Sequence, residues 1–256
     1  LGNCIIDLAA LVGMGVLRGG ALNAARAAGG SSLAPLLTVR AADISALRAQ
    51  LFRLYGAGTD GNRTELSAAL VPMSDAQSQL PMKPAAFTDF CTSMHHIRRM
   101  GGSSDAPPRL ACMSMPIAYN GRASSVIASG EPVVRPSGQF EVPPGSGNVR
   151  FGPEPMLDFE LEFGAWLRGG NPIGESLSVA QAEAQLFGCC LVNDWSARGI
   201  QFFEMILGPH LGKSFATTIS PWIVTMEALA PFRIPAPGRA ADEPAILPYL
   251  LDPRDQ

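Results

Sequence analysis

The chain has 256 residues, of which 47% are hydrophobic and 16% charged, so it can bury the core of one large domain or two smaller ones. Its formal net charge is −3 and it has no Lys/Arg-rich run, which argues against a nucleic-acid partner. The apolar opening is interrupted by Asp7 and is not preceded by basic residues, so neither a signal peptide nor a membrane span is expected there.

Residues 1–80 are expected to form a small accessory domain. A short apolar strand is predicted at 4–8, and Ala-rich stretches predict helices around 42–54 and 62–70. Little chemistry is concentrated in this segment, so the function is expected to lie beyond it.

From about residue 81 the sequence changes to short apolar runs separated by Gly and Pro, as in PPGSGNVRFGPEP. Short apolar runs separated by Gly and Pro are typical of a β-rich domain with long loops. One helix is predicted within it, capped by Ser178 with Gln181 reaching back, and ended by Gly188. The apolar CCLVN that follows predicts a central strand ending at Asp194.

The cysteines indicate a reducing environment. There are five, an odd number, without a Cys-x-x-Cys pair, and the neighbours Cys189 and Cys190 would point to opposite faces of a strand. We therefore expect a reduced, cytoplasmic protein.

The stretch LDFELEF at 157–163 predicts a strand with one apolar face and one acidic face. Glu160 and Glu162 share the acidic face. If that face is exposed to water, the alternation needs no further explanation. If it lines a cleft, a hard cation such as Ca²⁺ or Mg²⁺ would offset the repulsion between the carboxylates. Zinc is disfavoured, because no Cys or His lies nearby in the sequence.

Asp194, Asp89 and His96 are candidates for the same site. A carboxylate that closes an apolar strand is often placed in a site, although Asp194 alone is more often a cap or turn residue. Asp89 precedes His96 by seven residues. One loop could supply both, or Asp89 could cap a helix that carries exposed histidines.

Lys213 lies in LGPHLGKSFA, which approaches two other motifs. Only three residues separate Gly208 and Gly212, so the stretch is not a phosphate-binding loop. GKSFA ends on Ala216, which leaves a serine hydrolase as a minor alternative. Lys213 is then either an ordinary surface lysine or a cation that offsets the acidic cluster.

Several longer stretches together resemble the fumarylacetoacetase family. They are FTDF with His96, PIAYNGRASSVIASGEPVVRPSGQ, LDFELEF, LVNDWSARGIQ and LGPHLGKSFATTISPWIV, in the family's order over about residues 81–256. The resemblance implies a mixed, β-rich α+β fold. It consists of an SH3-like N-terminal domain over 1–80, which rests on the weaker match of IIDLAAL, and an incomplete β-roll catalytic domain over 81–256.

The resemblance further implies a metal-dependent hydrolase that splits a carbon–carbon bond of a β-diketo acid. The products would be fumarate and acetoacetate, in tyrosine and phenylalanine catabolism, and the full-length protein would be a homodimer. The family's carboxylates for Ca²⁺ or Mg²⁺ correspond to Asp89, Glu160, Glu162 and Asp194, and a magnesium position corresponds to Asp194, Lys213 and Thr217. The general base corresponds to His96, and the oxyanion or leaving-group contacts to Arg198, Gln201 and Lys213.

Some positions depart from the family's pattern. Cys91 stands where the family has a substrate-contacting tyrosine, and a second such tyrosine of the family falls at or beside Met205. Asn120 replaces a family histidine, and Gly199 replaces the acid of the family's SARD sequence. The family also continues beyond the position of Gln256, with a glutamate that pairs with the catalytic histidine, so weak metal binding and low turnover are expected of this chain. The alternatives are an acylpyruvate hydrolase or oxaloacetate decarboxylase on the same scaffold, or a non-catalytic remnant.

Overall fold

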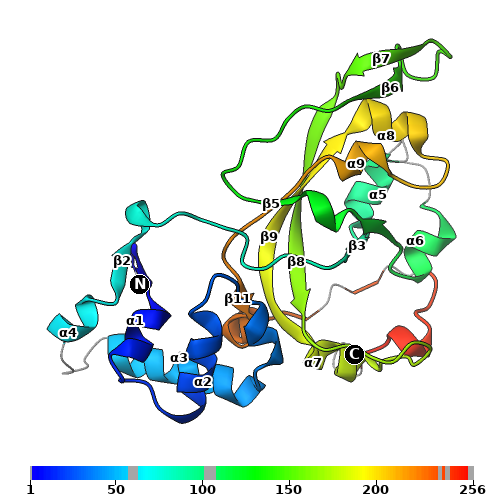
Figure 1. Cartoon of the computed structure of the whole chain (residues 1–256). Helices are drawn as coiled ribbons and strands as arrows, with labels where there is room; N and C mark the ends of the chain where they lie inside the picture. Colours follow the sequence, from blue (N-terminus) through cyan, green and yellow to red (C-terminus); the bar gives the residue numbers. More distant parts are fainter. Residues whose placement is uncertain (1, 57–62, 101–107, 236–237, 240–242, 253–256) are drawn as a thin grey trace.

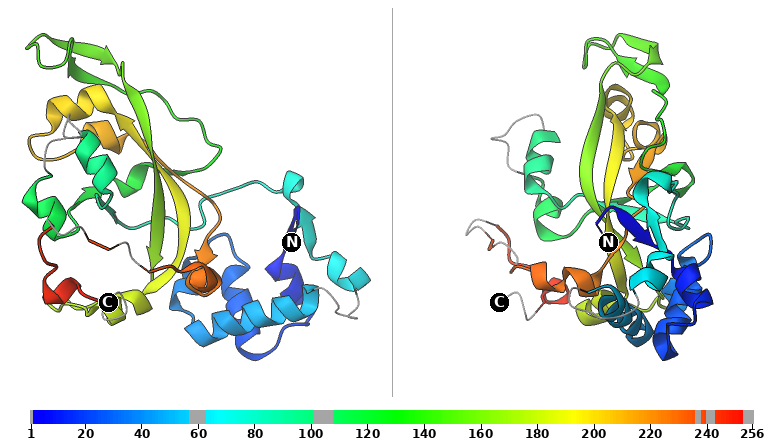
Figure 2. Two further views of the ribbon diagram at one scale, coloured as in Figure 1. Left: turned by 180° about the vertical axis from the view of Figure 1, so that it is seen from behind. Right: turned by 90° about the vertical axis from the view of Figure 1, so that its left-hand side faces the viewer.

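In the computed structural model, which describes residues 2–56, 63–100, 108–235, 238–239 and 243–252, a helical N-terminal lobe lies beside one end of two long strands (Figure 1). The strands are β8 (Leu157–Leu167) and β9 (Leu186–Ala197). The view from behind in Figure 2 shows the same arrangement.

The N-terminal lobe is built mainly from helices. Its elements are β1 (Cys4–Ile6), α1 (Leu8–Gly13), α2 (Gly19–Ala28), η1 (Ala34–Thr38), α3 (Ala41–Tyr55), α4 (Arg63–Ser67), β2 (Leu70–Pro72) and η2 (Met73–Asp75). Asp7, the residue that interrupts the apolar opening, caps α1 by accepting bonds from the amides of Ala9 and Ala10 at 2.8 and 3.1 Å. Ala21, Ala24 and Ala25 of α2 are fully buried and let α3 pack closely against it.

The expected SH3-like domain is not confirmed. Among the described residues of 1–80 the strands are β1 and β2, which form one antiparallel pair, and the rest of the regular structure is helical. The Ala-rich segment around 42–54 forms α3, because its residues favour helix over strand. The boundary at residue 80 stays a prediction, and Met82 and Phe187 are buried in the same cluster as Leu11.

A five-stranded sheet forms the centre of the second lobe. The strands β5 (Val126–Ala128), β10 (Thr217–Ile219) and β11 (Val224–Thr225) join β8 and β9 in it. The long strand β9 pairs antiparallel with β8 along one edge and with β10 and β11 along the other, and β10 pairs parallel with β5. This confirms a mixed, β-rich architecture for the region.

Shorter elements surround this sheet. Two antiparallel pairs flank it, β3 (Phe87–Phe90) with β4 (Ala118–Gly121) and β6 (Ser137–Glu141) with β7 (Val149–Pro153). The helical pieces are α5 (Met94–Met100), α6 (Leu110–Ser114), η3 (Ala123–Ser125), α7 (Val179–Ala184), α8 (Arg198–Glu204), α9 (Leu211–Ser214), α10 (Met226–Leu229), η4 (Ala230–Phe232) and η5 (Pro248–Leu250). Each helix in the described ranges is too short or too polar to span a bilayer.

The local predictions had mixed outcomes. The capping box of Ser178 and Gln181 is present at the start of α7. The prediction that Gly188 ends this helix was wrong, since α7 ends at Ala184 and Gly188 lies in β9, where a Cβ would stand 2.6 Å from the Val224 carbonyl oxygen. The helix expected at 62–70 is observed as the shorter α4, Arg63–Ser67. Position 62, the first of the expected range, lies outside the described residues.

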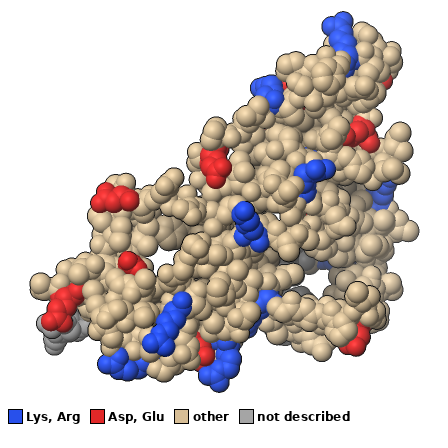
Figure 3. Space-filling model, in the orientation of Figure 1, with Lys and Arg blue, Asp and Glu red and all other residues tan. Residues whose placement is uncertain are grey.

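Strand β8 presents Glu160 and Glu162 inward and its large apolar side chains outward. Phe159, Leu161 and Phe163 are 61%, 74% and 65% exposed, whereas the Glu160 side chain is 14% exposed. In Figure 3, charged side chains are scattered among uncharged ones over the face shown. The acidic face of β8 is therefore the one that needs a chemical explanation.

Candidate metal centre

Three carboxylates from separate strands meet in the second lobe. Asp89 lies on β3, Glu162 on β8 and Asp194 on β9, and one oxygen of each lies within 4.8 Å of the other two. Asp194 is 1% exposed. Carboxylates this close repel one another unless protons or a cation intervene.

The register of the sheet explains why the side chains meet. Glu160 pairs with Asp194 across β8 and β9, and Thr217 of β10 pairs with Asp194 from the other side. Directly opposite residues share a face of the sheet. Glu162 lies on that same face because it is two residues from Glu160.

The pKa values in this cluster reflect burial and the repulsion between neighbouring carboxylates. Burial, followed by the charges of Asp89, Asp194 and Glu160, raises the pKa of Glu162 to about 8. Burial also raises the pKa of Asp194 to about 6, although Lys213 acts in the opposite direction. A cation bound between the three carboxylates would reverse this penalty.

Glu160 belongs to a different arrangement from the one that the sequence predicted. Its Oε1 lies 2.6 Å from Lys213 Nζ, 2.8 Å from Arg198 Nη1 and 3.4 Å from His96 Nε2. Burial raises the pKa of Glu160, but Lys213 and Arg198 outweigh it, so the pKa lies below its usual range. Three of the four predicted acids thus lie within 4.8 Å of one another, and the fourth faces cationic side chains; the four-acid ligand set stays a prediction.

Lys213 connects the two groups of acids. Its ammonium group donates to Asp194 Oδ2 at 2.6 Å and pairs with Glu160 at the same distance, and its side chain is 4% exposed. Lys213 is therefore the buried cation that offsets the cluster and not an ordinary surface lysine.

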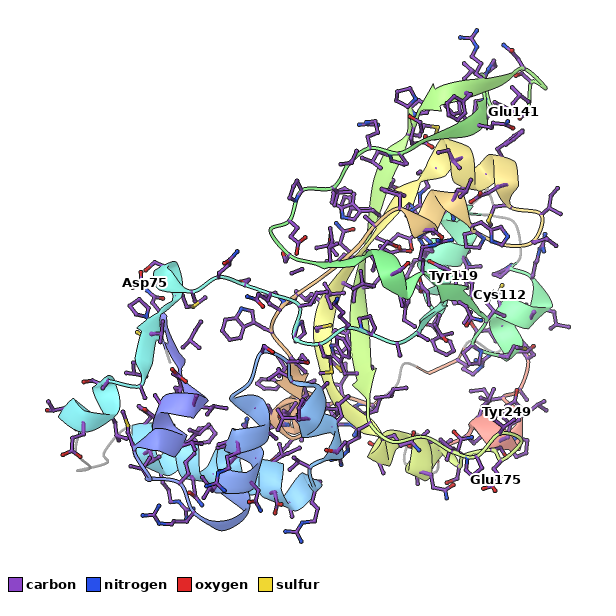
Figure 4. All side chains as sticks on the ribbon, in the orientation of Figure 1. Asp75, Cys112, Tyr119, Glu141, Glu175 and Tyr249 are labelled. Atoms are coloured by element: carbon purple, nitrogen blue, oxygen red, sulfur yellow. The ribbon has the colours of Figure 1, made fainter. Side chains whose placement is uncertain are left out.

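Tyr119 is a member of the cluster that the sequence analysis missed. Its hydroxyl lies 2.8 Å from both Asp89 Oδ2 and Asp194 Oδ2, and Figure 4 marks its place on β4. Burial and the two carboxylates raise its pKa, so it stays protonated. The signal that could have found it is the pairing of FTDF with AYNG, which sets Tyr119 opposite Asp89.

Of the predicted oxyanion contacts, Arg198 and Gln201 lie on α8 and Lys213 lies on α9, and Arg198 and Lys213 contact Glu160. Arg198 and Gln201 are buried, and Arg198 Nη1 donates to Gln201 Oε1 at 3.0 Å. Arg198 Nε donates to Asp158 Oδ2 at 2.9 Å, which gives the third acid of LDFELEF an orienting contact. His96 lies on α5 and Asp89 on β3, so the two do not come from one loop.

The residues present fit a hard divalent cation. Asp194 Oδ1 and Thr217 Oγ1 are buried, and neither has a hydrogen-bond partner among the described residues. With Asp89 and Glu162 they supply oxygen donors, the kind that Ca²⁺ and Mg²⁺ prefer. Buried unpartnered oxygens are costly, so an oxygen-binding ion is a physical reason for this arrangement.

The fold and these donors define a β-rich protein with a cluster of carboxylates whose oxygens suit a metal ion. Residues 85–237 match the family model described as "Fumarylacetoacetate (FAA) hydrolase C-terminal", which is more than half of the chain. The chain therefore belongs to the fumarylacetoacetate hydrolase family.

Curated relatives agree with this assignment. The chain is 41% identical over 98% of its length to the fumarylacetoacetase of Oryza sativa subsp. japonica, 46% over 70% to that of Arabidopsis thaliana and 41% over 73% to that of Homo sapiens. It spans 59%, 43% and 45% of those proteins. Among solved structures, a fumarylacetoacetate hydrolase from Exiguobacterium antarcticum aligns with a TM-score of 0.40 at 18% identity, over 63% of this chain and 50% of that one.

Proposed function

We propose that this chain carries the metal-binding and water-activating part of a hydrolase that cleaves fumarylacetoacetate to fumarate and acetoacetate. The observation that carries the proposal is the meeting of Asp89, Glu162 and Asp194 within 4.8 Å, next to Lys213. The relatives named fumarylacetoacetase favour this substrate over acylpyruvate or oxaloacetate.

In the proposed reaction, Asp89, Glu162, Asp194 and Thr217 would hold Ca²⁺ or Mg²⁺, which would supply positive charge to polarise the β-diketone. His96 takes a proton from water, whose oxygen forms a bond to one carbonyl carbon. Arg198, Gln201 and Lys213 donate hydrogen bonds to the oxyanion that develops. The oxyanion then collapses to the carboxyl group of fumarate as the carbon–carbon bond breaks, and the electron pair goes to the acetoacetate carbon, which receives the proton that His96 took from water.

Metal-dependent turnover tests the proposal. The chain is incubated with a β-diketo acid and either Ca²⁺ or Mg²⁺ while the diketone absorbance is followed, with Glu162→Gln as the variant. Loss of absorbance that requires the ion and is greatly reduced by Glu162→Gln supports the proposal. The matched control is Glu131→Gln, because Glu131 is exposed and lies outside the cluster. Absence of turnover with both ions would support the non-catalytic remnant.

We further propose that the ion is Ca²⁺ or Mg²⁺, that the protein is cytoplasmic and that the full-length protein is a homodimer. Oxygen donors suit both Ca²⁺ and Mg²⁺, and isothermal titration with each decides between them. No disulfide joins any of the five cysteines, all of which lie in the described residues; this suits the reducing cytoplasm, and fractionation of cells tests the location. The exposed apolar face of β8 supports a homodimer, which sedimentation tests.

A further inference from the structure

Glu154 is a buried carboxylate outside the metal centre. It lies between β7 and β8 and is 1% exposed. Its Oε1 accepts bonds from the amides of Met156 and Gly199 at 2.6 and 3.1 Å, and its Oε2 accepts from the amide of Ile200 at 2.9 Å. The bonds that fix this carboxylate therefore all come from the main chain within the described residues.

These bonds complete the start of helix α8. The residue before the helix, Ala197, makes no side-chain capping bond. The first amides of a helix lack partners within it and carry partial positive charge, so a carboxylate placed there stabilises the helix. Glu154 supplies this carboxylate from another part of the chain.

Helix α8 carries Arg198, which contacts Glu160, and Gln201, which contacts Arg198. Arg198 is its first residue, and Gln201 lies one turn further on. Arg198 Nη1 lies 2.8 Å from Glu160 and 3.0 Å from Gln201. The start of α8 is also tied to the entry of β8, because the amide of Arg198 donates to the Met156 carbonyl at 3.0 Å. A shift of this helix end would move the guanidinium away from Glu160.

Gly199 makes the approach of Glu154 possible. A Cβ at position 199 would lie 2.8 Å from Glu154 Oε1 and 3.3 Å from Oε2. The backbone at Gly199 does not have a positive φ, so the requirement is for space and not for an unusual conformation. Glu154 and Gly199 thus depend on each other.

We propose that Glu154 is a positioning residue that acts through α8 and holds Arg198 in place between Glu160 and Gln201, and that Gly199 leaves the space that Glu154 needs. The proposal rests on the proposed function for the role of Arg198 in the reaction. The capping itself rests on geometry alone.

The test compares Glu154→Ala, Gly199→Asp and the double variant, with Glu131→Gln as the control. Glu154→Ala removes the cap, and kcat is expected to fall about 10²-fold at nearly unchanged KM. Gly199→Asp forces a second carboxylate against Glu154 and is expected to lower kcat similarly. In the double variant the introduced carboxylate fills the vacated space at the helix start, so kcat is expected to recover at least about tenfold over either single variant.

A second cycle asks whether Glu154 acts through Arg198. In an Arg198→Ala background, Glu154→Ala is expected to change kcat little further, because the group that it positions is already absent. Calcium affinity is expected to be unchanged in Glu154→Ala, since Glu154 is not among the clustered carboxylates. Equal kcat in Glu154→Ala and the wild type, or no recovery in the double variant, would overturn the proposal.

Amide hydrogen exchange keeps the two proposals separate. Exchange at Gly199 and Ile200 is expected to be faster in Glu154→Ala than in the wild type, with α3 unchanged as an internal reference. In the double variant, exchange at Ile200 is expected to slow again. If the wild type shows no turnover, the proposed function fails, and exchange at these amides alone then decides the capping. Unchanged exchange in Glu154→Ala would overturn it.

Discussion

The two faces of strand β8 differ in the opposite sense from the usual alternation. On the inner face, Glu160 is almost buried and Glu162 is half-buried, while on the outer face Leu161 is 74% exposed. Burying carboxylates is unfavourable unless cations or hydrogen bonds compensate. The inner face has that compensation in Lys213 and Arg198, so charge partners from other elements, and not hydrophobicity, decide which face lies inward.

Removal of Lys213 should disturb this contrast most. Lys213→Met leaves Glu160 and Asp194 buried without their shared cation, and we expect a loss of about 3–5 kcal/mol in the free energy of unfolding. Urea denaturation of the metal-free protein measures it. The only other lysine, Lys83, is exposed, so Lys83→Met is the matched control and should change stability by less than about 0.5 kcal/mol. Equal effects of the two substitutions would contradict this view of the inner face.

Arg198 should affect activity more than stability. It contacts Glu160 and Gln201 from α8, and Arg198→Ala is expected to reduce kcat about 10²-fold because it removes a donor to the developing oxyanion. Steady-state kinetics with a β-diketo acid measures this. Arg150 on β7 is exposed, and Arg150→Ala serves as the control. A change in KM alone would assign Arg198 to substrate binding instead.

The raised pKa of Glu162 predicts how the stability of the metal-free protein depends on pH. Its folded pKa of about 8 lies above the ordinary value of 4.5, so between these values the folded protein holds a proton that the unfolded chain lacks. Unfolding then releases a proton, and the free energy of unfolding of the metal-free protein falls as pH rises through this window. Asp194, raised to about 6, adds the same trend at the acidic end.

Glu162→Gln should flatten this dependence, which thermal unfolding from about pH 5 to about pH 8 measures. Ca²⁺ should stabilise the wild type more at about pH 8 than at about pH 6, because binding requires the ionised carboxylate. A pH profile that is the same in the wild type and in Glu162→Gln would show that another group controls it.

Sequence reasoning was most successful where the signal was local or long and specific. The strands around LDFELEF and CCLVN and the capping box at Ser178 follow from alternation and short-range hydrogen bonding. The SH3-like domain was inferred from IIDLAAL alone, while the Ala-rich stretch that forms α3 indicated helix. In this lobe the local propensity was the better guide.

The site was only partly predictable for a different reason. The meeting of Asp89, Glu162 and Asp194 was expected from the family resemblance, but the orientation of Glu160 depends on where Lys213 and Arg198 lie in three dimensions. Tyr119 enters through the register of β3 and β4, which the sequence does not state. Contacts set by long-range pairing thus escape an analysis of separate motifs.

The smallest expected effect concerns the outer face of β8. Phe163 is 65% exposed and pairs with Leu191, which is also exposed, so Phe163→Ser should change the free energy of unfolding of a monomer by only about 0.5 kcal/mol. If two copies associate through this face, the cost should increase with protein concentration, since dissociation then precedes unfolding. Urea denaturation at two concentrations distinguishes these cases. A large cost that does not depend on concentration would mean that the outer face is covered within the folded chain, and the contrast between the two faces would then be lost.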